Sequence, residues 1–367
     1  MKVNILTKGF RSPNASSWLY PLVKNKIKLS KMGIDISFFL KNCDNVKDCD
    51  VVIVESKFVR GEWANNKEAI FKLLVSLKTT HNKVFFYDLG DSTYSWVLEV
   101  LPYVDKLLKT FVFKDKNNYC IPLDGCNIWT DYYFKSGSVE FDSFRTPQFL
   151  QEKNRHLLDK IQVGYNAVFA DHSLNSNLWK FDYFHKLTRG SFKIFEKMLT
   201  SVNSNNFVTP GERLKDVSCR MSLNGYSKGV EFHRQETAEI LNKHLLTNKL
   251  NRDRYFSEIC NSKVVVSPFG WGEINTPRDY EVALSGAVLL KPDISHIDTW
   301  PNIFNEDTVV QYKWDLSDLS LKLQDIVTNY DKYIEYAVNL QEQYKHYSFG
   351  EVGQNEFCKY FINMVKN

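Results

Sequence analysis

The 367-residue chain has few cysteines, and they do not form a metal-binding pattern. Its seven Cys are scattered, and no two are separated by only two residues. Structural zinc sites use four ligands at closer spacing, so a metal cluster is not expected. Reduced thiols fit this usage, as in cytosolic proteins.

Long apolar runs and a strong charge of either sign are also missing. The longest apolar run, Val282–Leu290, is about half the length that a membrane span needs. The N-terminus opens directly with a strand-like segment, so no signal peptide is expected. A net charge of +4 permits an anionic ligand or a membrane-surface encounter, but is too weak to indicate nucleic-acid binding. We expect a cytoplasmic protein that binds no nucleic acid, and peripheral contact with a membrane stays open.

What is present is an alternation of strand-like and helix-like segments. With 43% hydrophobic and 25% charged residues, the chain has the composition of a globular protein, and its length fits two domains. Alternating strands and helices predict an α/β fold with parallel sheets. The predicted N-terminal strands are Val3–Leu6, Ile34–Leu40, Cys49–Val54 and Lys83–Tyr87, with helices over 18–32 and Lys67–Lys78.

Turn-rich sequence predicts where one domain ends and the next begins. Asn203–Gly211 combines Asn, Ser, Pro and Gly and follows a segment, Asn175–Asn206, that we expect to be helical. The predicted units are therefore 1–206, 207–345 and a final amphipathic segment, 346–367.

The most informative stretch is Lys263–Leu290. It reads as a buried strand, a glycine loop at Phe269–Gly272, a helix capped by Thr276, and a second strand after Gly286. A strand, a glycine loop and a helix N-terminus together hold phosphates in α/β proteins, because free amides and the helix dipole face the anion. Arg278 adds a positive charge in the first helical turn.

The same stretch resembles the donor site of GT-B glycosyltransferases. Glu273 and Glu281 have the E-x7-E spacing of group 1 enzymes, and Tyr280–Leu290 is similar to their helix and strand. The sequence around Pro268–Glu273 also resembles that of exostosin-type C-terminal domains. The resemblance implies that the second Glu binds the ribose of a nucleotide sugar and that the loop and helix start hold its diphosphate. One difference is that Gly270 and Gly272 precede Glu273, whereas group 1 enzymes place these glycines after it.

An upstream segment, Asp216–Glu231, is similar to the "G-R-L…K-G" element of the same enzymes. There an Arg and a Lys neutralise the donor diphosphate, and Arg220 and Lys228 are the candidates here. Fixed cations suit this role, because a leaving nucleoside diphosphate builds negative charge.

On the acceptor side, Asp88–Thr93 follows a predicted strand at its carboxyl end, where open sheets bind ligands. If the enzyme inverts configuration, Asp91 or Asp88 is the expected base. The alternative is that Asp91 only begins a turn or caps a helix. The opening of the chain also resembles a GT-B acceptor domain, which would place Gly9 at the cleft.

Further residues are expected near the donor. Trp271 and Tyr280 would be core residues or a stacking platform for the base, and Asp293 and His296 would touch sugar or base. The predicted catalytic residues are Asp91, Asp88 and Glu273. The predicted donor-binding residues are Arg220, Lys228, Gly270, Trp271, Gly272, Thr276, Arg278, Tyr280, Glu281, Asp293 and His296.

The resemblance implies an α/β fold of two Rossmann-like domains facing a cleft, with a C-terminal helix that crosses back to the first domain. It implies a metal-independent hexosyl- or pentosyltransferase that needs no cofactor. The sugar would move from a nucleotide sugar (UDP, GDP or other) to a glycan, glycolipid or glycoprotein. Two alternatives stay open: a GT-B-fold nucleotide-sugar epimerase, and a non-catalytic glycan-binding protein. Retention and inversion also both stay open.

Overall fold

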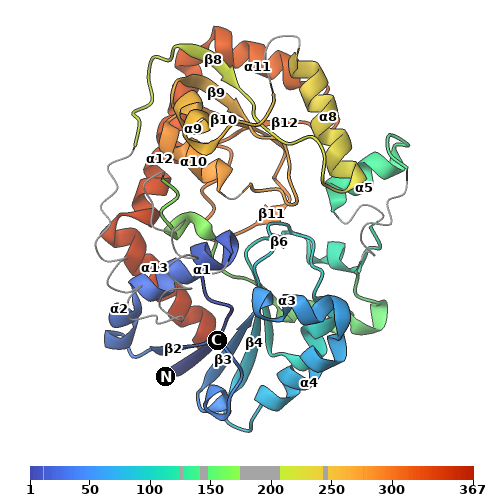
Figure 1. The fold of residues 1–367 in the computed structure, drawn as a ribbon, viewed down its shortest axis with the longest axis vertical. Helices are drawn as coiled ribbons and strands as arrows, with labels where there is room; N and C mark the ends of the chain where they lie inside the picture. Colours follow the sequence, from blue (N-terminus) through green and yellow to red (C-terminus); the bar gives the residue numbers. More distant parts are fainter. Residues whose placement is uncertain (11, 124–126, 141–147, 174–206, 243–246, 276) are drawn as a thin grey trace.

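Figure 1 shows the computed structural model, which consists of two sheets stacked end to end. The structure describes all residues except 11, 124–126, 141–147, 174–206, 243–246 and 276. The predicted helical segment at 175–206 and Thr276 therefore lie outside the described residues.

The N-terminal sheet has six parallel strands in the order β2-β1-β3-β4-β5-β7. Its strands are β1 (Lys2–Leu6), β2 (Asp35–Phe39), β3 (Val51–Glu55), β4 (Lys83–Asp88), β5 (Lys106–Lys109) and β7 (Ile161–Val163). Every residue of β3 is buried, as expected for a parallel strand covered on both faces. All four predicted N-terminal strands are confirmed.

Helices cover both faces of this sheet. One face packs against α1, α2 and the last helix of the chain, and the other against α3, α4 and η2. The helices of this part are α1 (Pro13–Lys24), α2 (Lys26–Lys31), α3 (Ser56–Asn65), α4 (Lys67–Leu77) and α5 (Ile128–Lys135). Its 3-10 helices are η1 (Asp44–Lys47), η2 (Leu98–Tyr103), η3 (Lys116–Cys120), η4 (Glu152–Lys160) and η5 (Ala167–Phe169).

The predicted first helix starts earlier than expected and is divided in two. Ser12 caps α1 by accepting a hydrogen bond from the Ala15 amide, and Pro13 takes the first helical position, where its missing amide costs nothing. Asn25 separates α1 from α2.

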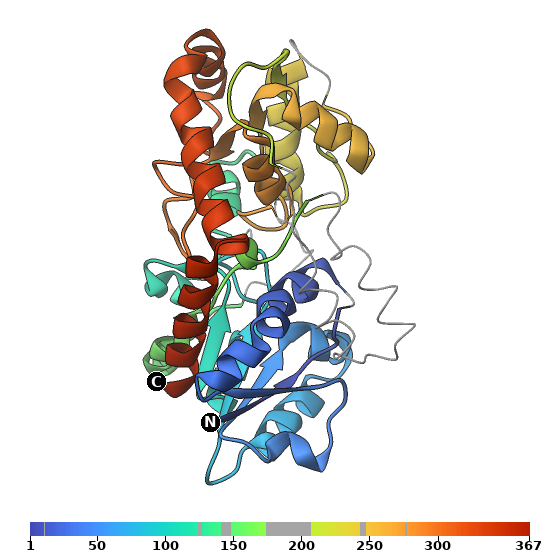
Figure 2. The same ribbon diagram turned by 90° about the vertical axis from the view of Figure 1, so that its left-hand side faces the viewer.

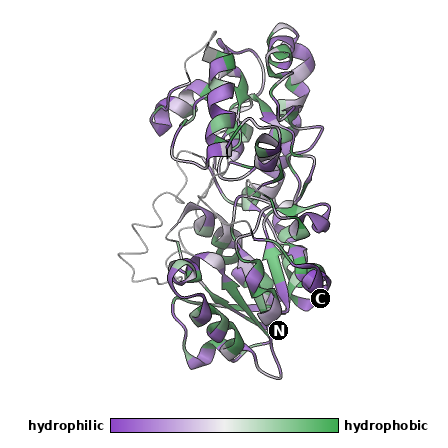
Figure 3. Cartoon of the chain, turned by 90° about the vertical axis from the view of Figure 1, so that its right-hand side faces the viewer, coloured by the Kyte–Doolittle hydropathy of each residue, from purple (hydrophilic) through white to green (hydrophobic). Residues whose placement is uncertain are grey.

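The C-terminal sheet has four parallel strands in the order β12-β10-β9-β8. Its strands are β8 (Lys215–Ser218), β9 (Ser262–Val266), β10 (Val288–Pro292) and β12 (Val310–Tyr312), and its helices are α8 (Lys228–Asn242), α9 (Arg252–Cys260), α10 (Arg278–Ser285) and α11 (Leu319–Thr328). The two faces contribute to separate apolar clusters, one with α8 and α11 and one with α9 and α10. Figure 3 shows green apolar strands enclosed by helices that carry purple hydrophilic surfaces.

Several features join the two sheets, among them a short ladder and the C-terminal helices. A short antiparallel ladder pairs β6 (Val112–Phe113) with β11 (Ile297–Asp298). The long helix α12 (Tyr330–Ser348) and then α13 (Glu351–Lys366) run from the C-terminal sheet down to the N-terminal one (Figure 2). The carbonyl oxygen of Met364 accepts a hydrogen bond from Lys106 of β5, 3.0 Å away. The predicted architecture is thus confirmed: two Rossmann-like domains with a terminal helix crossing back, which is the GT-B arrangement.

Two details differ from the predicted domain boundaries. The boundary drawn at 345/346 falls inside α12, because the chain continues as one helix to Ser348. The helix α5, placed in the first domain by sequence, packs against α8 of the second (Figure 1). Its Tyr133 contacts His233 of α8 at 2.7 Å.

Candidate functional site

The loops that follow β4 and β9 meet between the two sheets. The Thr93 hydroxyl donates to Glu273 Oε1 at 2.6 Å, and the Thr93 amide donates to Oε2 at 3.1 Å. A Cβ on Gly272 would lie 1.8 Å from the carbonyl oxygen of Asp91, so only glycine fits there. The predicted acceptor-side loop and the predicted donor-side loop are therefore in direct contact.

Glu273 holds this contact together. Its side chain is fully buried, and His296 Nε2 lies 3.5 Å from its Oε1. Burial raises the pKa of Glu273, but His296 and Thr93 more than offset this, so the pKa lies below its ordinary value. Glu273 is therefore an ionised carboxylate that joins the domains, and both its oxygens are engaged by Thr93 and His296.

Asp91 is the better placed of the two candidate bases. It accepts a short hydrogen bond from Asn14 and lines a cavity of about 30 Å³ with Trp18 and Asn166, room for about one water. Burial raises the pKa of Asp91, and the nearby Lys57 only partly counters this. A partly buried carboxylate with a raised pKa at the end of a central strand suits a general base.

Asp88, the other predicted base, has a different place. Its carboxylate is fully buried and accepts hydrogen bonds from Lys109 at 2.6 Å, Ser95 at 3.1 Å and the Gly90 amide at 3.0 Å. Such a saturated ion pair anchors the loop after β4, and no ligand reaches it in this arrangement.

On the donor side, α10 begins differently from the prediction. Pro277 occupies the cap position, and the side chain of Asp279 organises the loop instead of closing a capping box. Asp279 accepts from Ser267 Oγ at 2.6 Å, from the Asn275 amide at 2.8 Å and from Lys291 Nζ at 2.8 Å. These contacts fix the glycine loop against the end of β9 and against β10.

Arg278 lies at the start of α10 with part of its guanidinium unsatisfied. Its Nη1 is buried and has no hydrogen-bond partner. The groups that act on its charge are Tyr255 of α9, Cys219 directly after β8, and the carboxylates of Asp279 and Glu281. A buried donor without a partner costs free energy, so this atom is available to an anion at the carboxyl ends of the strands.

Arg234 is a second buried cation that sequence reasoning did not select. It donates to the carbonyl oxygens of Phe269 at 2.7 Å and Ser222 at 2.8 Å, and its guanidinium lies 4.2 Å from the Tyr226 ring. Burial, together with Arg278, lowers the pKa of Arg234 to about 10. The sequence around Arg234 does not indicate that it supports these loops, because its partners are backbone carbonyl oxygens.

Glu281, the predicted ribose ligand, is buried and paired. Its Oε1 lies 3.2 Å from Arg252 Nε, and Arg252 also donates to the carbonyl oxygens of His172 and Ser173. Burial raises the pKa of Glu281, and Arg252 opposes this. Its ribose role stays a prediction.

Arg220 is engaged differently from the prediction, and Tyr280 takes the core place, one of the two predicted for it. Arg220 forms a bidentate pair with Glu258, at 2.9 and 2.7 Å, which ties α9 to the end of β8. Tyr280 is fully buried, and its ring stacks on His172 with centroids 4.7 Å apart. Arg220 is therefore engaged within the protein, and Tyr280 is a core residue that cannot stack on a base.

The remaining predicted residues lie around these loops. Lys228 is the exposed first residue of α8, and Trp271 is 36% exposed with its ring centroid 5.2 Å from that of Tyr226. Gly270 lies beside Arg234 and Asn275. Asp293 follows β10 and accepts from the Ser295 amide at 2.8 Å. Gly9 follows β1 in the left-handed region (φ 71°) and donates its amide to Thr7.

Within the described residues, no group of three or more His, Cys, Asp or Glu side chains could hold a metal ion. None of the described helices is both long and apolar enough to cross a membrane.

Comparison with known proteins finds similarity in structure only. No model of a protein family matches the chain, and no curated protein matches it in sequence. Among solved structures, an α1,3-fucosyltransferase matches at 12% identity and a TM-score of 0.44, over 100% of this chain and 90% of that one. HepE from Anabaena in complex with UDP matches at 10% identity and a TM-score of 0.42, over 100% of this chain and 99% of that one. An α-glucosyltransferase in complex with UDP-glucose and DNA containing an abasic site matches at 10% and 0.40, over 100% of both chains. Similarity this low does not carry an activity or a substrate over to this chain, and the exostosin-like resemblance stays a prediction.

Replacing Gly272 should separate the two loops. We expect Gly272→Ala to lower the free energy of unfolding by about 1–3 kcal/mol, because the new methyl group overlaps the Asp91 carbonyl. Gly61→Ala is the matched control: it lies in α3 with open space around it, so it should be neutral or stabilise by up to about 1 kcal/mol. Urea denaturation measures both, and a Gly272→Ala protein as stable as the wild type would contradict the contact.

The pair between Arg220 and Glu258 should make stability depend on pH. Burial raises the pKa of Glu258, but the hydrogen bonds from Arg220, Ser218 and Lys215 lower it by more, so that the pKa is about 2. Because the folded pKa is depressed, this stabilisation is present above the ordinary carboxyl pKa and is lost as pH falls toward 2. We expect Glu258→Gln to cost about 2 kcal/mol at pH 7, allowing for solvent screening, and progressively less below pH ~4.5. A difference that stays constant from pH 7 to pH 3 would show that the carboxylate charge is not the cause.

Proposed function

We propose that the protein is a glycosyltransferase that moves a hexosyl or pentosyl group from a nucleotide sugar to a carbohydrate acceptor. The observation that carries the proposal is the buried Nη1 of Arg278, which has no hydrogen-bond partner. It lies at a helix N-terminus, next to a glycine loop and at the carboxyl end of a parallel strand, where α/β proteins hold phosphates.

The donor diphosphate would bind to Arg278 at the start of α10, where the Asp279 amide is already bonded to the Asn275 carbonyl. Lys228, the exposed first residue of α8, is the other cation that we propose for the diphosphate. The exposed Trp271 and the half-buried Tyr226 beside it are the proposed platform for the base, in place of Tyr280. Positive side chains and helix dipoles at these places can stabilise the leaving diphosphate, so we propose that no metal is required.

The acceptor would approach from the N-terminal sheet. Asp91 is the proposed base that takes the proton from the attacking hydroxyl, since its raised pKa brings it closer to the working pH. Glu273 would act as a positioning residue, because its contact with Thr93 holds the Asp91 loop against the donor loop. Inversion of configuration follows if Asp91 has this role.

Nucleotide binding tests the donor site. We expect one of UDP, GDP, ADP, CMP or dTDP to stabilise the wild type by about 2.7 kcal/mol at a hundred times its dissociation constant. Arg278→Met should abolish this stabilisation but change the stability of the free protein by only about 1 kcal/mol, because it removes a buried donor that has no partner. Thermal melting with and without each nucleotide measures both effects.

Arg220→Met is the matched control for that experiment. It leaves Glu258 without its bidentate partner, so the free protein should lose about 2 kcal/mol or more, while the stabilisation by nucleotide persists. If no nucleotide stabilises well-folded wild type, the transferase proposal is wrong, and a glycan-binding protein becomes the better description.

Changing Asp91 tests the acceptor side. Asp91→Asn should slow release of nucleoside diphosphate from the matching nucleotide sugar by about 10²–10⁴-fold, with nucleotide binding unchanged. In the wild type the rate should fall with decreasing pH through a value above the ordinary carboxyl pKa, because the base becomes protonated. The exposed Asp298 is the control, and Asp298→Asn should keep both rate and profile. Full activity of Asp91→Asn would remove Asp91 from the mechanism.

A further inference from the structure

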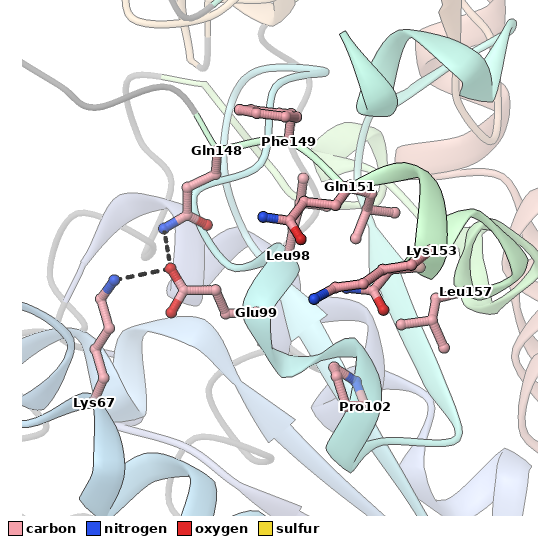
Figure 4. A pocket seen from close by; sticks show the side chains of 11 residues that line it. Lys67, Leu98, Glu99, Pro102, Gln148, Phe149, Gln151, Lys153 and Leu157 are labelled. Carbon is pink, nitrogen blue, oxygen red and sulfur yellow. Dashed lines mark hydrogen bonds and ion pairs between the residues drawn. The ribbon is translucent and has the colours of Figure 1, made fainter. Parts of the chain in front are cut away.

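A groove of about 510 Å³ lies on the N-terminal domain and shares no lining residue with the candidate site (Figure 4). It is bordered by the start of α4, by η2 and by the segment from Gln148 to Leu157. Its volume is in the range of small-molecule sites. Its lining combines one aromatic ring, three side-chain amides, one carboxylate and two lysines.

One side of the groove carries a polar cluster with spare hydrogen-bonding capacity. Glu99 Oε1 accepts from Lys67 Nζ at 2.9 Å and from Gln148 Nε2 at 3.1 Å. These bonds fix the side-chain amide of Gln148, and the Oε1 atom of that amide is buried without a partner. In Figure 4 that oxygen lies on the side of the Gln148 amide nearer to Gln151. A ligand hydroxyl there would satisfy an acceptor that the protein leaves unpaired.

Another side is apolar and exposed. Phe149 is 42% exposed, and Figure 4 shows its ring above the groove. Leu98, Pro102 and Leu157 line the groove below it. A flat apolar surface next to amides suits a pyranose ring, which has a face of C–H groups and an edge of hydroxyls. The ion pair with Glu99 offsets the charge of Lys67, and Lys153 adds one further positive charge to the lining, so an acidic sugar fits as well as a neutral one.

The groove is tied to the loop that carries the proposed base. The backbone N–H of Gln148 donates to the Tyr94 hydroxyl at 2.9 Å, and Tyr94 is three residues after Asp91. The next wall residue, Leu150, donates its amide to the carbonyl of Tyr119, whose hydroxyl donates to the Thr93 carbonyl at 2.9 Å. The groove wall and the Asp91 loop are thus held together by two independent connections.

We propose that this groove binds an oligosaccharide, namely the part of a glycan chain that does not react. The proposal that the groove binds a glycan does not depend on the proposed function. The proposal that this glycan is the acceptor of the transfer reaction rests on it. An extended acceptor bound here would gain affinity from sugars far from the transferred bond, so the preferred acceptors would be oligosaccharides and not monosaccharides.

The test uses the intact protein and a printed array of defined neutral and acidic oligosaccharides, followed by calorimetric titration with the one that binds best. Phe149→Ala and Gln148→Ala should each weaken that binding at least tenfold and leave stabilisation by nucleotide unchanged. Tyr132→Ala is the matched control, because Tyr132 is equally exposed, at 40%, and lines a different cavity. It should bind the oligosaccharide as the wild type does.

The outcomes separate this proposal from the proposed function. If no oligosaccharide binds, or if binding survives both groove substitutions, the groove is not a glycan site, whatever the nucleotide experiment shows. If an oligosaccharide binds in the groove while no nucleotide stabilises the protein, the groove proposal holds and the transferase proposal falls.

Discussion

The buried carboxylate of Glu273 is the constraint on which the arrangement of the two domains depends. A fully buried charge must be hydrogen-bonded, and the donors that satisfy Glu273 come from Thr93, 180 residues earlier in the chain. The contact brings Gly272 against Asp91, so no side chain fits at that position. One electrostatic requirement thus fixes the distance between the proposed donor loop and the proposed base.

A similar arrangement stabilises the loop on each side of this contact. In the N-terminal sheet Asp88, at the end of β4, pairs with Lys109 of the next strand at 2.6 Å. In the C-terminal sheet Asp279, at the start of α10, pairs with Lys291 at 2.8 Å, and all four side chains are fully buried. Removing one partner of such a pair typically costs 3–5 kcal/mol, because the other charge is left alone. Each loop is therefore held rigidly where it meets the other.

The strands and the glycine loop could be predicted from the sequence, because local periodicity and turn chemistry determine them. The ion pairs could not, because Lys109 and Lys291 interrupt apolar strands without showing which carboxylate they meet. The position of α5 is a second case: its packing on α8 depends on the contact between Tyr133 and His233, 100 residues apart. Burial also decides that Tyr280, polar at one end, is a core residue.

The two arginines predicted for the diphosphate show how partners decide function. Arg220 and Arg278 lie near the same strand end, and the charge of each lowers the pKa of Cys219 against the larger effect of burial, which raises it. Arg220 has a bidentate carboxylate partner, so binding a phosphate would require breaking an ion pair that is already formed. Arg278 has a buried nitrogen with no partner, so binding an anion there removes a cost that the free protein bears. Anion binding is therefore more favourable at Arg278 than at Arg220. The sequence does not show this difference, because both residues are arginines near a strand end.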